Sequence, residues 1–216
     1  GFSASQDWEG LVDEPIIFHS ALNSSSVSSI YTNQSAGNGW DGSARACSTL
    51  LANWRMDELN WSGTANEVID SSGNGFHATA TNGAVTAGSS PVINGNPGTC
   101  RYGEFEDAGG TNGDHLVVSG FPNITQDFSI TGWIRSSDVS RKGQRVFADD
   151  QSNSGGYALS LGDGGSGRLR FYSRAASPVS LDSNAVISNN TWYFVAGLAD
   201  ITNKTKTIYI YSLAGT

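Results

Sequence analysis

Basic side chains and long apolar runs are both scarce in this chain. Only 15% of the residues are charged, and 20 acidic side chains against 12 basic ones give a net charge of −8 and a sequence pI near 4.7. Phosphate binding needs a basic face, so this charge makes nucleic acid a poor partner and suits a surface that holds cations. No window approaches the length of apolar sequence that spans a bilayer, so we expect no membrane insertion.

A start methionine and a secretory leader are missing as well. The sequence begins at Gly1, which cannot be a natural translation start. We therefore expect a chain that is processed, excised or incomplete.

Cysteine is limited to Cys47 and Cys100. An even count in a chain rich in Ser, Thr and Asn suits an oxidising compartment and a single disulfide. Closing a loop of about 50 residues would stabilise the fold by roughly 4 kcal/mol in the chain-entropy model. Two buried free thiols are the alternative, whereas zinc is disfavoured because no CxxC or His pairing accompanies either cysteine.

Catalytic signatures are also scarce. His19, His77 and His115 have no metal-ligand spacing, and no serine lies in a GxSxG elbow. A glycosidase needs two carboxylates facing each other across a cleft. Glu104 and Glu106 lie two apart on one predicted strand and are better explained as a solvated strand face. We therefore expect that the protein is not an enzyme, and a glycoside hydrolase is the less favoured alternative.

What the chain does contain is 27 glycines and a period-2 alternation of apolar and polar side chains. Residues 127–135 alternate in this way, as a long strand of a sandwich does. Similar short segments recur between Gly- and Asn-rich turns, at 102–105, 115–118, 145–148, 157–161, 168–172, 192–198 and 205–211. This cadence predicts an all-β, two-sheet antiparallel sandwich.

The first 46 residues depart from this pattern. Residues 9–20 are typical of a closing strand, and residues 23–32 of one short helix capped by Asn23 or Ser24. A fresh opening strand starts at residue 50, and no closing segment follows the last strand, 206–211. We therefore expect residues 1–32 to be the closing strand and helix of a preceding or neighbouring sandwich, residues 33–46 to be a linker, and residues 47–216 to be a sandwich that lacks its own closing segment.

Several motifs, taken in order, resemble the laminin-G-like, concanavalin A-like jelly-roll family. They are Asp57-Glu58, Asp70-Ser-Ser-Gly-Asn-Gly75, Tyr102-Gly-Glu-Phe-Glu106, Asp127-Phe-Ser-Ile-Thr-Gly-Trp133 and Trp192-Tyr-Phe-Val-Ala196. The resemblance covers most of the chain and implies a jelly roll. The placement of Cys47 and Cys100 also resembles the repeats of MSHA-pilus-associated surface proteins of marine gammaproteobacteria. In the family the closing strand comes last, whereas here residues 11–18 come first.

The stretch 70–75 is the strongest chemical signal. Short oxygen-bearing side chains separated by glycines can converge on a hard cation such as Ca²⁺. The resemblance implies a structural calcium near this loop. Its predicted ligands are Asp70, Asn74, a carboxylate of the opening strand (Glu58 or Asp57) and one of the closing strand (Asp13 or Glu14). An Asx-turn that merely reverses the chain is the alternative.

The closing strand has its own predicted role in assembly. Its apolar residues are Leu11, Val12, Ile16, Ile17 and Phe18. Pro15 restricts this strand to an edge or bulge position, and an uncovered apolar edge is a hazard. We expect the strand either to insert into an adjacent copy, giving a head-to-tail array, or to fold back into its own sandwich as a permuted closing strand. The family's strand order favours the neighbour.

Sugar recognition commonly uses exposed aromatic platforms. The candidates by residue type are Trp40, Trp61, Tyr157 and Tyr172, and the polar surroundings of Trp40 and Trp61 predict that these two are exposed. Trp54, Trp133 and Trp192 lie in apolar strands and are expected in the core. The sequence thus predicts a secreted, non-catalytic module of a bacterial surface or pilus-associated adhesive protein that binds carbohydrate or glycoprotein. A structural filament subunit assembling head-to-tail by strand complementation is the alternative.

Overall fold

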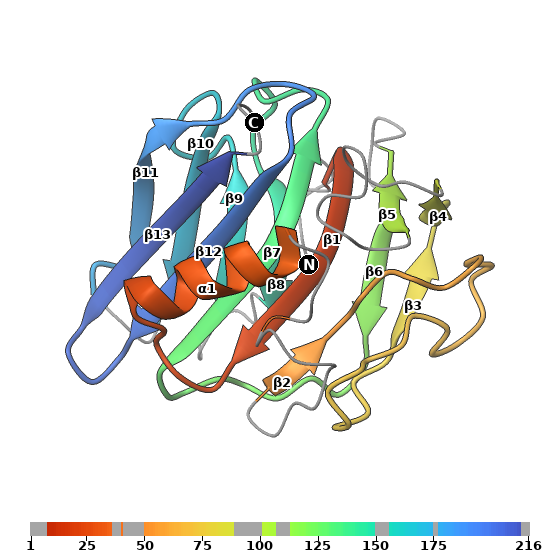
Figure 1. Cartoon of the computed structure of the whole chain (residues 1–216), viewed down its shortest axis with the longest axis horizontal. Coiled ribbons are helices and arrows are strands. Elements are labelled where there is room, and N and C mark those ends of the chain that lie inside the picture. The colour runs from red at the N-terminus through yellow and green to blue at the C-terminus, as the bar shows by residue number, and fades with distance from the viewer. Residues whose placement is uncertain are drawn as a thin grey trace.

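Two antiparallel β-sheets packed face to face form the body of the protein (Figure 1). The structure is a computed structural model, and it describes residues 8–35, 40, 50–88, 101–106, 113–149, 156–174 and 177–212. In the described residues, the larger sheet runs in the order β13-β12-β7-β1-β5-β4, and β2 also pairs with β1. Its strands are β1 (Gly10–Phe18), β2 (Leu50–Asn53), β4 (Val85–Ala87), β5 (Tyr102–Phe105), β7 (Phe128–Ser136), β12 (Tyr193–Asp200) and β13 (Thr205–Ser212).

The smaller sheet has the order β11-β10-β9-β8. Its strands are β8 (Gln144–Asp149), β9 (Tyr157–Leu161), β10 (Arg168–Ser173) and β11 (Ser180–Val186), and a further pair is formed by β3 (Ala78–Thr81) and β6 (His115–Val118). Side chains from both sheets meet in one inner core, which includes Phe128, Ile130, Leu159 and Phe171. The predicted all-β, two-sheet jelly-roll sandwich is confirmed.

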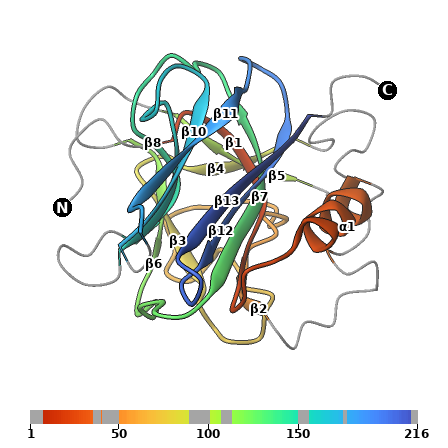
Figure 2. The same cartoon turned by 90° about the vertical axis from the view of Figure 1, so that its left-hand side faces the viewer.

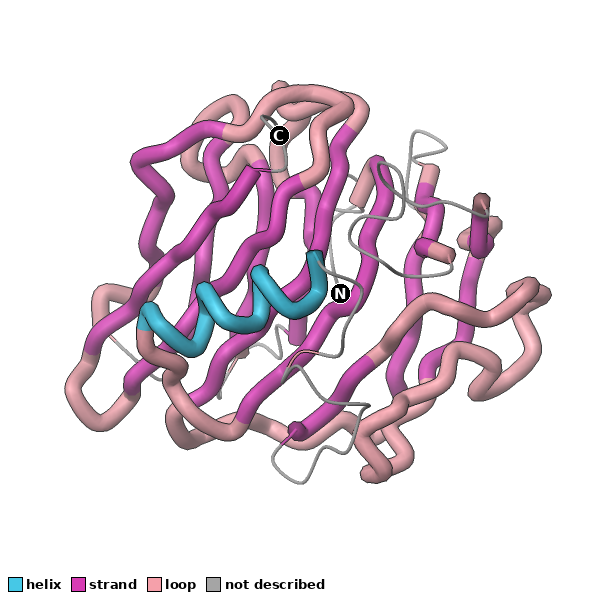
Figure 3. The backbone as a smooth tube through the Cα atoms, viewed as in Figure 1, coloured by secondary structure: helices cyan, strands magenta, loops and turns pink. Residues whose placement is uncertain are grey.

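A single helix of the described part, α1 (Ser24–Ser35), covers the outer face of the larger sheet (Figure 3). Its start follows the predicted cap, because the Asn23 Oδ1 accepts a 2.8 Å hydrogen bond from the Ser26 amide. Val27 and Ile30 are buried, and the Tyr31 ring stacks on Tyr211 with centroids 4.9 Å apart. The helix therefore closes a second, outer core on the side of the sheet away from β8–β11, as Figure 2 shows.

β1 lies inside the sheet of its own chain. It pairs with β7 along its length, and on its other side with β5 at residues 10–12 and with β2 at residues 16–18. The favoured expectation, insertion into a neighbouring copy, therefore differs from the structure, which shows the permuted closing strand folded back. The sandwich assigned to residues 47–216 is completed by β1, and the predicted linker lies largely outside the described residues.

The burial of β1 explains this placement. Leu11, Ile16 and Phe18 belong to the outer core beneath α1, whereas Val12 and Ile17 belong to the inner core. A strand that is apolar on both faces needs cover on both faces, and here the smaller sheet covers one face and α1 the other. Tertiary packing therefore places β1 in the middle of the sheet.

A bulge accommodates Pro15 at this central position. The pairing of β1 with β7 shifts register between Asp13 and Ile16, and Glu14 has a left-handed backbone with φ of 48°. Gly132 of β7 faces the bulge, and a Cβ there would lie 3.2 Å from the Pro15 Cα. Since proline has no amide hydrogen to pair, a bulge is one of its two predicted positions, and that prediction is confirmed.

Replacing Ile17 by Ala tests the central position of β1. Ile17 is fully buried, so the cavity should lower the free energy of unfolding by about 2–5 kcal/mol. Val186→Ala is the matched control, because Val186 is 57% exposed and its truncation should change stability by no more than about 0.5 kcal/mol. Urea unfolding measures both, and equal small effects would contradict a buried central strand.

Glu14 carries an unusual proton affinity. Its burial raises its pKa from 4.5 to about 8, the Arg55 guanidinium opposes this rise, and the Asp57 carboxylate adds to it. The folded state thus holds a proton that the unfolded chain releases above about pH 4.5. Stability contributed by this proton is present at low pH and is lost as the pH rises through this window towards 8.

Glu14→Gln should therefore flatten the pH dependence of unfolding between about pH 5 and pH 8.5. In wild-type protein the urea midpoint should fall over this range, and in the variant it should fall less. Glu67→Gln is the control, since Glu67 is only half-buried and hydrogen bonds from Ser62 and Gly63 outweigh its desolvation and lower its pKa, which confines its effect to more acidic solution. An identical slope in wild type and Glu14→Gln would refute the buried proton.

Candidate functional site

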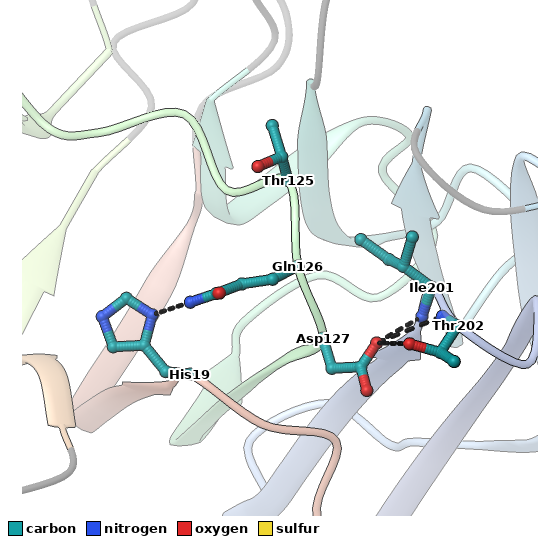
Figure 4. Close-up of a pocket in the computed structure, with 6 residues that line it drawn as sticks. All are labelled: His19, Thr125, Gln126, Asp127, Ile201 and Thr202. Carbon is teal, nitrogen blue, oxygen red and sulfur yellow. Dashed lines mark hydrogen bonds between the residues drawn. The ribbon is translucent and has the colours of Figure 1, made fainter.

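The ends of three central strands meet at one edge of the larger sheet. β7 runs antiparallel between β12 and β1. The residues after β1, before β7 and after β12 are consequently brought together. They line an open recess of about 390 Å³, formed by His19, Thr125, Gln126, Asp127, Ile201 and Thr202 (Figure 4).

Asp127 holds the turn that forms one side of the recess. Its Oδ1 accepts hydrogen bonds from the Ile201 amide at 2.8 Å, the Thr202 amide at 3.2 Å and the Thr202 hydroxyl at 3.4 Å. Figure 4 shows all three bonds on the same carboxylate oxygen. The carboxylate therefore ties the start of β7 to the end of β12.

His19 and Gln126 form the opposite side. The Gln126 Nε2 lies 2.8 Å from the His19 Nδ1. With the amide nitrogen as donor, Nδ1 accepts and the ring proton lies on Nε2. The recess thus presents an imidazole, a side-chain amide, hydroxyls of Thr125 and Thr202, and one apolar side chain, Ile201. Such groups can donate to and accept from the hydroxyls of a polar ligand.

The predicted calcium loop has an internal network of hydrogen bonds. Asp70 is buried, and its Oδ1 accepts from the amides of Asn53 and Ser72, both at 2.9 Å. Its Oδ2 accepts from the Ser72 hydroxyl at 2.8 Å and the Phe76 amide at 3.0 Å. The Asn74 amide nitrogen donates to carbonyls of β2. These bonds match the alternative interpretation, an Asx-turn that fastens the loop to β2.

The other two predicted ligands lie in different surroundings. Glu58 accepts from the Trp61 indole at 3.0 Å and from the Ile69 amide at 2.9 Å. Asp13 is fully buried in β1, opposite Trp133 of β7. In the part of the chain that the structure describes, no three His, Cys, Asp or Glu side chains lie together as metal ligands would. The structure brings Asp70 and Asn74 together through Ser72, and calcium binding stays a prediction.

The predicted sugar-binding tryptophans are not open platforms. Trp61 is only 3% exposed and packs against Phe105, with Gly103 leaving room for its ring. Trp40 is half-buried and meets Phe18 edge to face at 5.1 Å. Their expected exposure was wrong because polar neighbours in sequence do not report what packs over a side chain in space.

The remaining aromatic residues named from the sequence differ in their burial. Trp54, Trp133 and Trp192 are buried as expected. Tyr157 is fully buried between the sheets, and Tyr172 is half-exposed on β10.

Cys47 and Cys100 lie outside the described residues, so their disulfide stays a prediction.

Sequence reasoning missed the recess. Its residues come from three segments more than 50 residues apart, and no short motif joins them. The one available signal was a polar residue at the end of each of three apolar strands. His19 follows the first of these strands, Asp127 precedes the second, and Thr202 follows the third. Using that signal requires the strand order, which the sequence does not contain.

Residues 109–211 match a laminin-G family model described as the concanavalin A-like lectin/glucanases superfamily. This segment is just under half of the chain, includes β6 to β12 and ends within β13. With the two-sheet sandwich, the match supports a jelly-roll domain of that superfamily. No curated protein and no solved structure matches the chain, and the family match does not show the resemblance to pilus-associated repeats. The helix of the described part falls short of the length and apolarity needed to cross a membrane.

Asp70→Ala should separate the two interpretations of the loop. Losing a buried acceptor of four hydrogen bonds should lower the free energy of unfolding by about 3 kcal/mol or more. If the loop also binds calcium, adding Ca²⁺ after chelation should raise the melting temperature of wild-type protein and not that of the variant. Asp182→Ala, which removes an exposed partner of Arg170, should cost under about 1 kcal/mol. No calcium effect in wild type would leave the loop as a turn.

Proposed function

We propose that this chain is a non-catalytic module that binds carbohydrate or glycoprotein, with a sugar taken up in the recess of Figure 4. The observation that carries the proposal is the lining. An amide, an imidazole and two threonine hydroxyls surround an open polar hollow. Sugar hydroxyls are both donors and acceptors, so they need partners of both kinds placed close together.

The same lining favours binding over hydrolysis. Glycosidases work with two carboxylates facing each other across the scissile bond. Asp127 is the one carboxylate among the residues that line the recess, and its Oδ1 is engaged by the turn after β12. A site of this composition can hold a sugar without providing an acid and a base.

The superfamily match supports the proposal at the level of the domain, since its description includes lectins and glucanases. The cellular setting, a secreted bacterial surface or pilus-associated adhesive protein, is proposed from the composition and the placement of the cysteines in the sequence. A structural calcium at the 70–75 loop is part of the same proposal and is tested by Asp70→Ala.

Strand complementation in a filament is the less favoured alternative. β1 pairs with three strands of its own chain and supplies side chains to both cores. Exchange of β1 with another copy would require all of these contacts to break within one chain and to form again between two chains. The folded-back strand therefore favours a closed binding module.

Binding should depend on the recess. A glycan array identifies ligands of the wild-type protein, and calorimetric titration then compares variants. Gln126→Ala combined with His19→Ala should weaken binding about tenfold or more, as expected for the loss of two hydrogen bonds. Asn60→Ala, which removes an exposed side-chain amide elsewhere, should bind like wild type. An array without selective binding, together with concentration-dependent polymers, would instead support the filament subunit.

A further inference from the structure

α1 is a helix that its own sequence supports poorly. Six of its twelve residues are serine, and Val, Ile, Tyr, Thr and Asn supply all but one of the others. These residue types have lower helix propensities than Ala, Leu, Lys or Glu. The first turn has no acidic side chain and the last turn has no basic one, so the helix dipole is not complemented. Such a short helix is not stable alone, and α1 therefore depends on its packing against the larger sheet.

The packing of α1 centres on one aromatic side chain. Trp133, Phe194 and Tyr211 are direct neighbours on β7, β12 and β13 and form a row across the outer face of the larger sheet. The Tyr31 ring centre lies 5.8, 6.2 and 4.9 Å from the ring centres of this row, in that order. Two other apolar side chains of α1 are buried. The helix thus covers the aromatic row with few side chains, as its course across the sheet in Figure 1 shows.

Polar side chains are buried in the same layer. Gln34 follows Val27 and Ile30 on one face of the helix and is 1% exposed, so its side chain faces the sheet. Neither atom of its side-chain amide has a hydrogen-bonding partner among the described residues, and the same holds for the Trp133 Nε1 and the Thr131 Oγ1. Thr131 shares the face of Trp133, two residues along β7. A polar group that is buried without a partner weakens the packing that buries it.

The chain on either side of α1 is anchored independently of the helix. Before α1, the Ser129 hydroxyl of β7 donates to the Ser20 carbonyl at 2.7 Å and accepts from the Leu22 amide at 3.0 Å. After α1, the Trp40 ring meets Phe18 of β1 edge to face at 5.1 Å. A helix that leaves the sheet is therefore held nearby at both ends and can return to the same place.

We propose that α1 is a lid that opens by local unfolding while the sandwich stays folded, and that it controls access to the row of Trp133, Phe194 and Tyr211. Among the described residues, the inner core that joins the two sheets includes none from α1. Opening the lid therefore breaks only the outer packing. Elements with few buried apolar contacts open at a lower free energy than core strands. The buried amide of Gln34 favours opening further, because the open helix returns it to water.

Hydrogen exchange of the full chain, followed by mass spectrometry, tests the lid. Amides of α1 should exchange about 100-fold faster or more than those of β7 and β12. Gln34→Leu removes the buried amide and keeps a similar helix propensity, so α1 exchange should slow about tenfold. Thr32→Leu is the matched control, because Thr32 is on the exposed face of α1. This control should change α1 exchange by less than about threefold.

Thiol labelling tests whether the covered face becomes accessible. Ala196 and Ala199 are both buried on β12, the first in the outer core and the second in the inner core. Ala196→Cys should react with an alkylating reagent about tenfold faster or more than Ala199→Cys. Peptide mapping separates these thiols from Cys47 and Cys100, and melting temperatures identify any variant that fails to fold.

Three results would overturn the proposal. Equal exchange of α1 and β7 amides, or equal labelling of the two introduced thiols, would show that α1 opens only when the whole sandwich unfolds. Unchanged or faster α1 exchange in Gln34→Leu would show that the Gln34 amide is satisfied in solution and helps to hold the helix closed.

Discussion

The insertion of β1 between β7 on one side and β2 and β5 on the other is the constraint on which the rest of the structure depends. Its residues alternate between two cores, with Ile17 facing the smaller sheet and Ile16 facing α1. Removing the strand would separate β7 from β2 and β5 and open both cores together. The bulge at Glu14 and Pro15 is accepted within this strand because the packing on either side of it is extensive.

The same strand positions the candidate recess. His19 reaches Gln126 only because β1 ends beside the start of β7, and Asp127 reaches Thr202 because β7 also lies beside β12. The site is therefore a product of sheet order, and its geometry is supported by backbone pairing beneath it. Loops at the ends of a rigid sandwich are well suited to binding, since their side chains vary without disturbing the core.

The two sheets of the sandwich have different outer faces. Aromatic side chains on the larger sheet are covered by α1, whose Tyr31 stacks on Tyr211. The smaller sheet leaves arginines, aspartates and Tyr172 on its outer side, where Arg170 pairs with Asp182 across β10 and β11.

Local patterns in the sequence determined the class of fold, the helix with its Asn23 cap, and the bulge that Pro15 requires. These features depend on neighbouring residues, whose alternation and hydrogen-bonding groups can be read along the chain. Tertiary structure alone decided that β1 is central, that Trp61 is buried against Phe105, and that Asp70 accepts its bonds from β2 and its own loop. It also brought His19, Gln126, Asp127 and Thr202 to one edge. Each of these outcomes depends on pairing between segments far apart in sequence, and such pairing is selected by the burial of whole faces, which no local window contains.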